Sequence, residues 1–164
     1  GALICDENYQ HSYPHCWRHK TPLIFMATPQ WFISMTKSGL LKGASRAVED
    51  VTFIPDWGKE RMEIMLKDRP DWCISRQRDW GIPITLLYQK DTGELHSEQN
   101  EIFVKASEAI KDSGIDSWAN LDLGIDEEGY EKSKDIFDVW FDSGITHYCV
   151  VDELFGSNTQ SDLY

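Results

Sequence analysis

The stretch from Asp71 to Ile84 restricts the fold of this chain more than any other. It reads DWCISRQRDWGIPI, so two tryptophans bracket Arg76 and Arg78, and Gly81 and Pro83 follow. Glycine and proline impose particular backbone paths, and planar guanidinium groups suit carboxylates and phosphate oxygens. Two interpretations stay open: the arginines face a polyanion or a buried carboxylate, or they pair with some of the many acids while the tryptophans pack in the core.

Acidic side chains are concentrated in the second half of the chain. The formal net charge is −12, but residues 1–90 carry 12 basic and 10 acidic side chains, whereas residues 91–164 carry 4 basic and 18 acidic ones. Binding of phosphates needs clustered lysine and arginine. Any contact with RNA is therefore expected from the first half, and the second half is expected to face solvent or other protein.

Length and composition predict a folded core of about one domain. The 164 residues are 41% hydrophobic and include seven tryptophans, enough apolar surface to offset the entropy of ordering the chain. The four cysteines lie far apart, without the spacing of a disulfide framework. No apolar run approaches the ~18 residues that cross a bilayer. We expect a cytoplasmic protein with no membrane partner.

Hydrophobic periodicity and capping residues predict the secondary structure. Three helices are expected. The first covers residues 40–48, and the second follows an N-cap at Asp56 and carries an apolar stripe of Met62, Met65 and Leu66. The third begins at Ser97 and is followed by Gly114 at its C-terminus. One or two strands are expected within residues 21–35, with further strands over residues 51–54, 82–88, 94–96 and 136–141. Residues 1–20 indicate an extended connector, residues 115–134 a weakly patterned acidic stretch, and the residues after Asp152 a loose tail.

Three tryptophan-rich blocks resemble those of a known family. They are the segment from His11 to Pro22 that continues through PQWFIS at residues 29–34, the WCISRQRDWG segment at residues 72–81, and DVWFDSG at residues 138–144. The same blocks occur in this order and spacing in the class I aminoacyl-tRNA synthetases of large hydrophobic amino acids. Their wording is most similar to the isoleucyl-specific branch, because the valyl branch differs in the third block and the leucyl branch in the first.

The resemblance implies an α/β fold, namely part of a Rossmann-like catalytic domain with a small α+β insertion. Members of the family are several times longer, so an internal fragment that follows the editing insertion is expected. The expected divisions are a connector with the first strands at 1–35, a catalytic-domain part at 36–85, an acidic insertion at 86–134, and a catalytic-domain strand with a loose tail at 135–164.

The resemblance also implies a parent isoleucine-tRNA ligase, which activates isoleucine with ATP and magnesium and transfers it to tRNA(Ile). Trp140 resembles one wall of the isoleucine side-chain pocket, a role that suits a rigid indole; packing alone is the alternative. Asp138, Asp142 and Ser143 lie near the substrate site if the strand ends there, or they are capping residues. The parent is expected to be a monomer.

Neither ATP signature of the family is present. No two histidines have the His-x-Gly-His spacing, and the segment from Ser34 to Ser38 (SMTKS) stands in the wrong block for the Lys-Met-Ser-Lys-Ser loop. Without these groups the fragment alone is expected to be inactive.

Several polar side chains are further site candidates. Contacts with tRNA, or structural pairing, are expected for Arg76, Arg78, Arg18 and Lys20. Cys16 and His19 have the spacing of half a zinc site, but tetrahedral zinc needs four ligands and no second half-site is present in the sequence. We therefore expect a knuckle without zinc.

A different class of function stays open, namely a free-standing RNA-binding or metal-stabilised interaction module without catalysis. It predicts that the isolated chain binds tRNA tightly and that binding weakens steeply as salt rises. The fragment interpretation predicts weak binding or none. A fragment of a valyl- or leucyl-tRNA synthetase is a nearer alternative.

Overall fold

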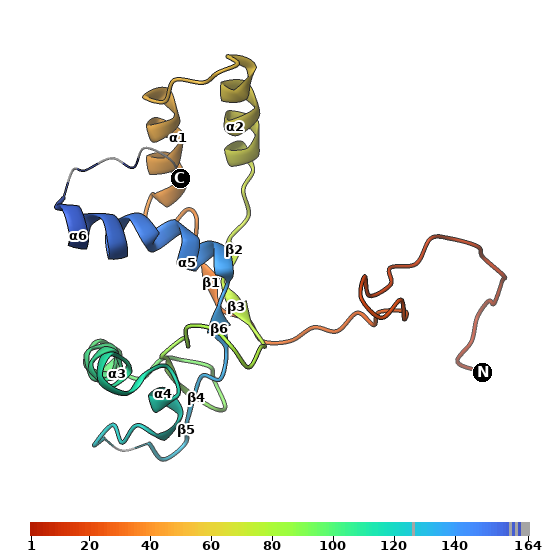
Figure 1. Cartoon of the computed structure of the whole chain (residues 1–164). Coiled ribbons are helices and arrows are strands. Elements are labelled where there is room, and N and C mark those ends of the chain that lie inside the picture. Colours follow the sequence, from red (N-terminus) through yellow and green to blue (C-terminus); the bar gives the residue numbers. More distant parts are fainter. Residues whose placement is uncertain (126, 158, 160, 162–164) are drawn as a thin grey trace.

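The chain folds as groups of helices around a narrow centre of short strands (Figure 1). The computed structural model describes residues 1–125, 127–157, 159 and 161. Strands in this part of the chain form three two-stranded antiparallel ladders, which gives a mixture of helices and small sheets. At the centre, β1 (Phe32–Ile33) pairs with β2 (Trp72–Cys73), and β3 (Ser75–Arg76) pairs with β6 (Ile136–Phe137).

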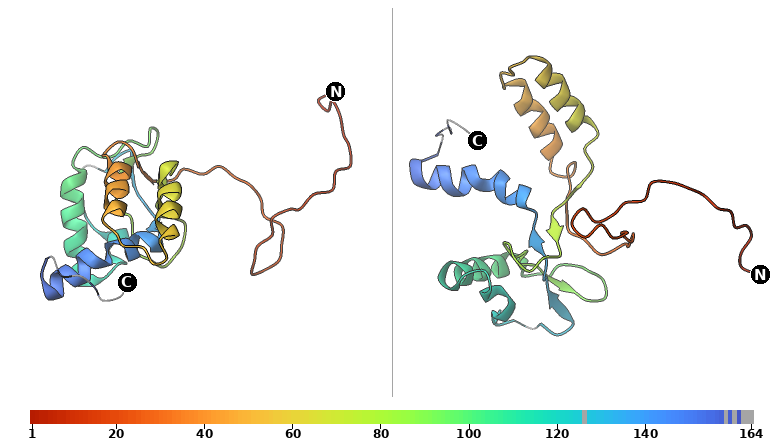
Figure 2. Two further views of the ribbon diagram at one scale, coloured as in Figure 1. Left: turned by 90° about the horizontal axis from the view of Figure 1, so that it is seen from above. Right: turned by 45° about the vertical axis from the view of Figure 1, so that its right-hand side comes forward.

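The residues before Thr28 form an extended arm that runs away from the rest of the molecule (Figures 1 and 2). Its local order comes from an isolated bridge between His15 and Pro22 and from edge contacts of the Tyr13 ring with His15 and Phe25. The predicted extended conformation of residues 1–20 is confirmed, and their role as a connector stays a prediction. Within residues 21–35 one strand forms, and it is only two residues long because β2 offers it only two partners.

Helices α1 (Leu40–Glu49) and α2 (Trp57–Lys67) lie side by side as a helical hairpin (Figure 1). Both helices were expected from periodicity, but the expected apolar stripe of α2 is not a core face. Met62 is 40% exposed and Met65 is 53% exposed, and among the described residues of the two helices only Val48 is buried. The pair therefore leaves apolar surface in contact with solvent.

Two predictions about the connection between these helices are wrong. Residues 51–54 form no strand, because they lead from one helix to its neighbour and pair with no other strand; Ile54 is 93% exposed. Asp56 does precede α2, but its side chain accepts no capping hydrogen bond. Its backbone is already helical (φ −54°, ψ −33°), whereas a capping side chain needs a non-helical backbone at that position.

The best-packed core belongs to residues 86–134. It is built by β4 (Leu87–Gln89), α3 (Gln99–Ser113), α4 (Ser117–Asn120) and β5 (Tyr130–Lys132). Its fully covered apolar side chains are Leu87, Ile102, Ala106, Trp118 and Leu123. The buried Gln99 side chain links α3 to β4: its Oε1 accepts from the Leu87 N–H at 3.0 Å, and its Nε2 donates to the Thr85 carbonyl at 2.9 Å.

The sequence predicted only part of this unit. α3 begins two residues after Ser97 and ends directly before Gly114, whose φ of +83° explains the glycine there. The expected hairpin around Gly93 exists, but it is reduced to β4 and a single bridge between Tyr88 and Leu95. The main partner of β4 is β5, which lies in the stretch expected to be weakly patterned.

The segment after β6 differs from the predicted strand over residues 136–141. β6 ends at Phe137, and α5 (Val139–Thr146) begins directly after Asp138, whose carboxylate accepts a hydrogen bond from the Trp140 N–H. A capping residue therefore ends the strand. The helix continues through η1 (His147–Asp152) and α6 (Glu153–Phe155), so the expected loose tail is wrong as far as residue 155. Residues 158, 160 and 162–164 of that tail lie outside the described residues.

None of the described helices combines the length and the apolar character that a membrane crossing requires.

Candidate functional site

The second and third motif blocks and the last residues of the first block meet at the centre of the molecule. We call residues 11–34 the first block, residues 71–84 the second block and residues 138–144 the third block. Ser75 joins the first two and is 1% exposed. Its hydroxyl donates to Gln30 Oε1 at 2.7 Å and accepts from the Trp31 N–H at 2.8 Å. Because both roles of this buried hydroxyl are satisfied, it fixes the first block against the second.

Arg76 joins the second block to the third. Its guanidinium forms an ion pair with Asp138 Oδ2 and donates to the carbonyl oxygens of Cys73 at 3.0 Å and Ser75 at 2.7 Å. Asp138 is 4% exposed, and a buried charge requires a charged or hydrogen-bonding partner. Arg76 therefore lies against a buried carboxylate that is also one of the chain's own acids, so this pair fits both interpretations of its sequence context.

Aromatic contacts hold the first turn of α5 to the centre. The Phe141 ring stacks on Phe137 with a centroid separation of 4.4 Å and lies 6.1 Å from the Trp72 ring. The neighbouring Trp140 side chain is different, because the residue is 73% exposed. The third block thus packs through Phe141 and presents the Trp140 indole to solvent.

Gly81 allows the second block to approach β6 closely. Its φ is +151°, and a Cβ at this position would lie 2.4 Å from Ile136 Cδ1. On the next residue, the Ile82 carbonyl accepts a hydrogen bond from the Phe137 N–H at 2.8 Å. A glycine is therefore required where the second block crosses the strand that leads into the third.

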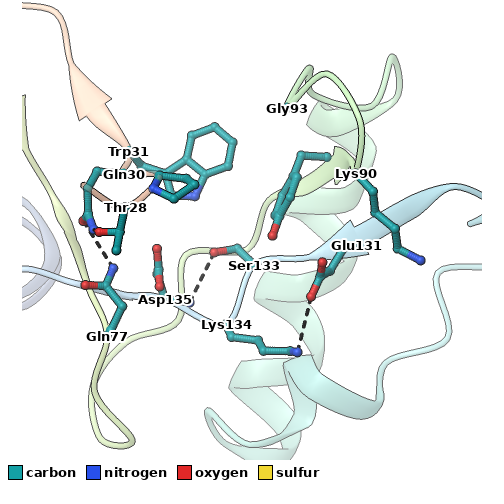
Figure 3. Close-up of a pocket in the computed structure, with 12 residues that line it drawn as sticks. Thr28, Gln30, Trp31, Gln77, Lys90, Gly93, Glu131, Ser133, Lys134 and Asp135 are labelled. Atoms are coloured by element: carbon teal, nitrogen blue, oxygen red, sulfur yellow. Dashed lines mark hydrogen bonds and ion pairs between the residues drawn. The ribbon is translucent and has the colours of Figure 1, made fainter. Parts of the chain in front are cut away.

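A cavity of about 620 Å³ lies beside this centre, between the first block, β4 and the segment from β5 to β6 (Figure 3). The Trp31 and Tyr88 rings meet edge to face at its wall, 5.6 Å apart. Its charged lining residues are Lys90, Lys134, Glu131 and Asp135, so cations and carboxylates balance. Trp140 is not among the lining residues, which separates this cavity from the predicted isoleucine wall.

Burial perturbs two ionisable groups near the centre. Burial, and to a lesser extent the charge of Asp138, raises the pKa of the Asp142 carboxyl. Burial also raises the pKa of the Tyr88 hydroxyl, with smaller contributions from the carboxylates of Glu131 and Asp135. Both groups are therefore held in their protonated forms over a wider pH range than usual.

Arg78 does not accompany Arg76. It lines a second hollow, of about 350 Å³, together with Asp79 and residues of α4. The bracketing Trp80 is 82% exposed. Among the described residues, an arginine lies over an indole ring only where Arg18 covers Trp17, at 5.0 Å.

The remaining predicted site residues lie on the arm. Cys16 Sγ and His19 Nδ1 are 3.5 Å apart, and Lys20 adopts a φ of +61°. Across the described part of the chain, no three His, Cys, Asp or Glu side chains come together to hold a metal ion. The arm that carries these residues runs away from the centre (Figure 1).

Comparison with known proteins decides the family. The model of the tRNA synthetases class I (I, L, M and V) family matches residues 6–163. The chain belongs to this family. Isoleucine-tRNA ligases of Marinomonas sp. (strain MWYL1), Ruthia magnifica subsp. Calyptogena magnifica and Coxiella burnetii (strain CbuG_Q212) are 53%, 51% and 52% identical over the whole chain. The chain spans 18% of the length of each relative, so it corresponds to a segment of such a class I synthetase.

Within this synthetase segment, the sequence left the role of Asp138 open between substrate site and cap, and the structure supports the cap. The sequence did not indicate the hydrogen bond between Ser75 and Gln30. Ser75 does lie inside the second block, but a serine in a motif carries no signal of its partner when the two are 45 positions apart. Aspartate is a preferred N-cap, but the sequence predicted a strand over residues 136–141, so it did not show the helix that Asp138 caps.

Proposed function

We propose that this chain is the part of an isoleucine-tRNA ligase that follows the editing insertion and forms one side of the amino-acid activation site. The whole enzyme would activate isoleucine with ATP and magnesium and transfer it to tRNA(Ile). Identity of 50% or more to isoleucine-tRNA ligases over the full chain supports this proposal. The observation that carries the proposed site is the meeting of the three motif blocks through Ser75, Arg76 and Asp138.

Trp140 is the residue that we assign to the isoleucine side chain. Its indole is exposed while the ring of the next residue, Phe141, is packed, so a flat apolar face is free to contact a branched alkyl group by dispersion. A pocket of this kind separates isoleucine from valine by only about 1–3 kcal/mol, because the two differ by one methylene. Opposite walls of the pocket would come from other parts of the enzyme.

The chain alone is proposed to be inactive, because its sequence contains neither ATP signature. The described residues also do not fit a magnesium or zinc site, since no cluster of three potential ligands is formed. We therefore assign no metal-dependent step to this segment. A Rossmann-like catalytic body would require strands beyond the small ladders described above.

Contacts with tRNA are proposed for Arg18, Lys20 and Arg78, which are exposed. Arg76 is better suited to a structural role, because its guanidinium is engaged by Asp138 and by two carbonyls. Such surface cations would add a salt-dependent contribution to affinity rather than sequence specificity. The free-standing RNA-binding module is not favoured, since the family match covers nearly the whole chain.

We also propose the division into a connector (1–35), a catalytic-domain part (36–85), an acidic insertion (86–134) and a returning catalytic-domain part (135–164). In support, the main buried cluster is built entirely from residues 87–123, inside the third of these ranges. A core that is complete within one range is what an inserted unit requires. The parent enzyme is proposed to be a cytoplasmic monomer.

The proposed function is tested with the full-length enzyme. Isoleucine-dependent exchange of pyrophosphate into ATP is expected, with valine and leucine as weaker substrates, followed by charging of tRNA(Ile). Replacing Trp140 with alanine should raise the KM for isoleucine and leave the KM for ATP unchanged. Preference for valine or leucine would contradict the assigned amino acid, and an unchanged KM for isoleucine would remove the role of Trp140.

A further inference from the structure

Asp138 holds the start of α5 through three separate contacts. Its own N–H donates to the Ile74 carbonyl at 2.8 Å, and its Oδ1 accepts from the Trp140 N–H at 2.8 Å. Its Oδ2 pairs with Arg76. Because the residue is 4% exposed, water cannot readily replace these partners. The Trp140 N–H is therefore connected to Arg76 of the second motif block through the Asp138 carboxylate, and the backbone hydrogen bond to Ile74 holds Asp138 to the same block.

Arg76 is the fixed end of this connection. Its NH1 donates to the carbonyls of Cys73, at the end of β2, and of Ser75, in β3, while its NH2 reaches Asp138, which lies 62 positions away. A planar guanidinium that serves all three acceptors has little freedom to turn. Movement of Asp138 relative to β3 would break contacts that are otherwise satisfied.

The Trp140 indole depends on this connection more than its neighbour does. Phe141 is held by its own ring contacts with Phe137 and Trp72. Trp140 is 73% exposed, so the place of its indole is set mainly by the backbone at the start of α5. A change that shifts this turn would move the indole while the ring of Phe141 stays packed.

We propose that Asp138 and Arg76 are positioning residues for Trp140: they hold the first turn of α5 so that the indole forms a fixed wall of the isoleucine pocket. This inference rests on the proposed function of Trp140. A displacement of about 1 Å in a binding site can cost on the order of 100-fold in rate. Since one methylene is worth only about 10-fold to 200-fold in selectivity, the position of the wall determines how well isoleucine is preferred over valine.

The test uses the full-length enzyme and the pyrophosphate exchange reaction. Asp138→Asn keeps an oxygen that can cap the helix but removes the charge that Arg76 requires. Arg76→Met removes the cation, and Arg76→Lys keeps a charge without the planar fork. Asp138→Asn and Arg76→Met are expected to raise the KM for isoleucine by about 10-fold to 100-fold and to reduce the preference over valine, with the KM for ATP unchanged. Arg76→Lys should restore part of the preference.

The matched control is Arg61→Met, which removes the same type of side chain from an exposed site on α2. It should leave the KM for isoleucine, the KM for ATP and the preference for isoleucine over valine unchanged. A rise in the KM for ATP that parallels the rise for isoleucine would indicate general disruption and would overturn the positioning role.

Combination with Trp140→Ala separates this inference from the function on which it rests. If Asp138 and Arg76 act through the indole, their substitutions should cause no further rise in the KM for isoleucine once the indole is absent. Additive effects would overturn the positioning role while leaving Trp140 in the pocket. No effect of Trp140→Ala by itself would instead overturn the proposed pocket. If Asp138→Asn or Arg76→Met prevents folding, the cycle with Arg76→Lys decides between the same outcomes.

Discussion

Replacing Gly81 with alanine tests the close packing of the second motif block against β6. The φ of +151° imposes strain on any residue with a side chain, about 1–3 kcal/mol. The new Cβ would also lie 2.4 Å from Ile136 Cδ1, and overpacking of this kind costs about 1–3 kcal/mol more. We therefore expect the free energy of unfolding to fall by about 2–6 kcal/mol.

Urea unfolding of this chain, followed by tryptophan fluorescence, measures the change. Gly129→Ala is the matched control, because Gly129 has a φ of +79° but no atom within 4 Å of the added Cβ. It should show only the strain, about 1–3 kcal/mol. Ile136→Val removes the Cδ1 atom that clashes with the added Cβ. The double variant should therefore be about 1 kcal/mol more stable than the sum of the two single losses in unfolding free energy predicts. Equal losses at the two glycines, with an additive double variant, would refute this reasoning.

Three further substitutions, one of them with a control variant, test other parts of the structure. Leu87→Ala should lower the free energy of unfolding by about 2–5 kcal/mol, whereas the exposed Val104→Ala on α3 should change it little; urea unfolding compares the two. Ser75→Ala leaves a backbone N–H of the first block without its partner and should cost about 1–3 kcal/mol by the same assay, and no loss would exclude the contact. Asp142→Asn should raise the Tm at neutral pH. The pKa of Asp142 is raised in the folded state, so as pH rises through 3.8 the carboxyl ionises more readily in the unfolded chain, and its ionisation lowers the stability of the fold. The increase in Tm caused by Asp142→Asn should therefore vanish in strong acid, where the carboxyl is protonated in both states.

The helices were the most predictable part of the fold, because their signals are local. Apolar residues at helical spacing indicated α1, α2 and α3, and Gly114 marked the end of α3. The strands were less predictable. Each central ladder pairs only two residues per strand, and β3 and β6 lie about 60 positions apart, so neither alternation nor a turn signal identifies them.

The candidate site was also predictable only where its signals are local in the sequence. The motif blocks identified Arg76 and Trp140 as residues of interest, but a side chain's partner depends on the tertiary fold. Arg76 pairs with a buried aspartate, while Arg78, only two positions away, lines a different hollow. Residues two positions apart in a regular strand lie on the same face, so the separation of these two arginines reflects the irregular backbone that begins where β3 ends, at Arg76.

The meeting of the second and third motif blocks is measured most directly by nuclear Overhauser effects between aromatic ring protons in this chain. The rings of Trp72 and Phe141, 69 positions apart in the sequence, have centroids 6.1 Å apart. Cross-peaks between their ring protons are therefore expected, as are strong ones between Phe137 and Phe141, which stack at 4.4 Å. Cross-peaks within the Phe137–Phe141 pair but none to Trp72, with both rings assigned, would contradict the account.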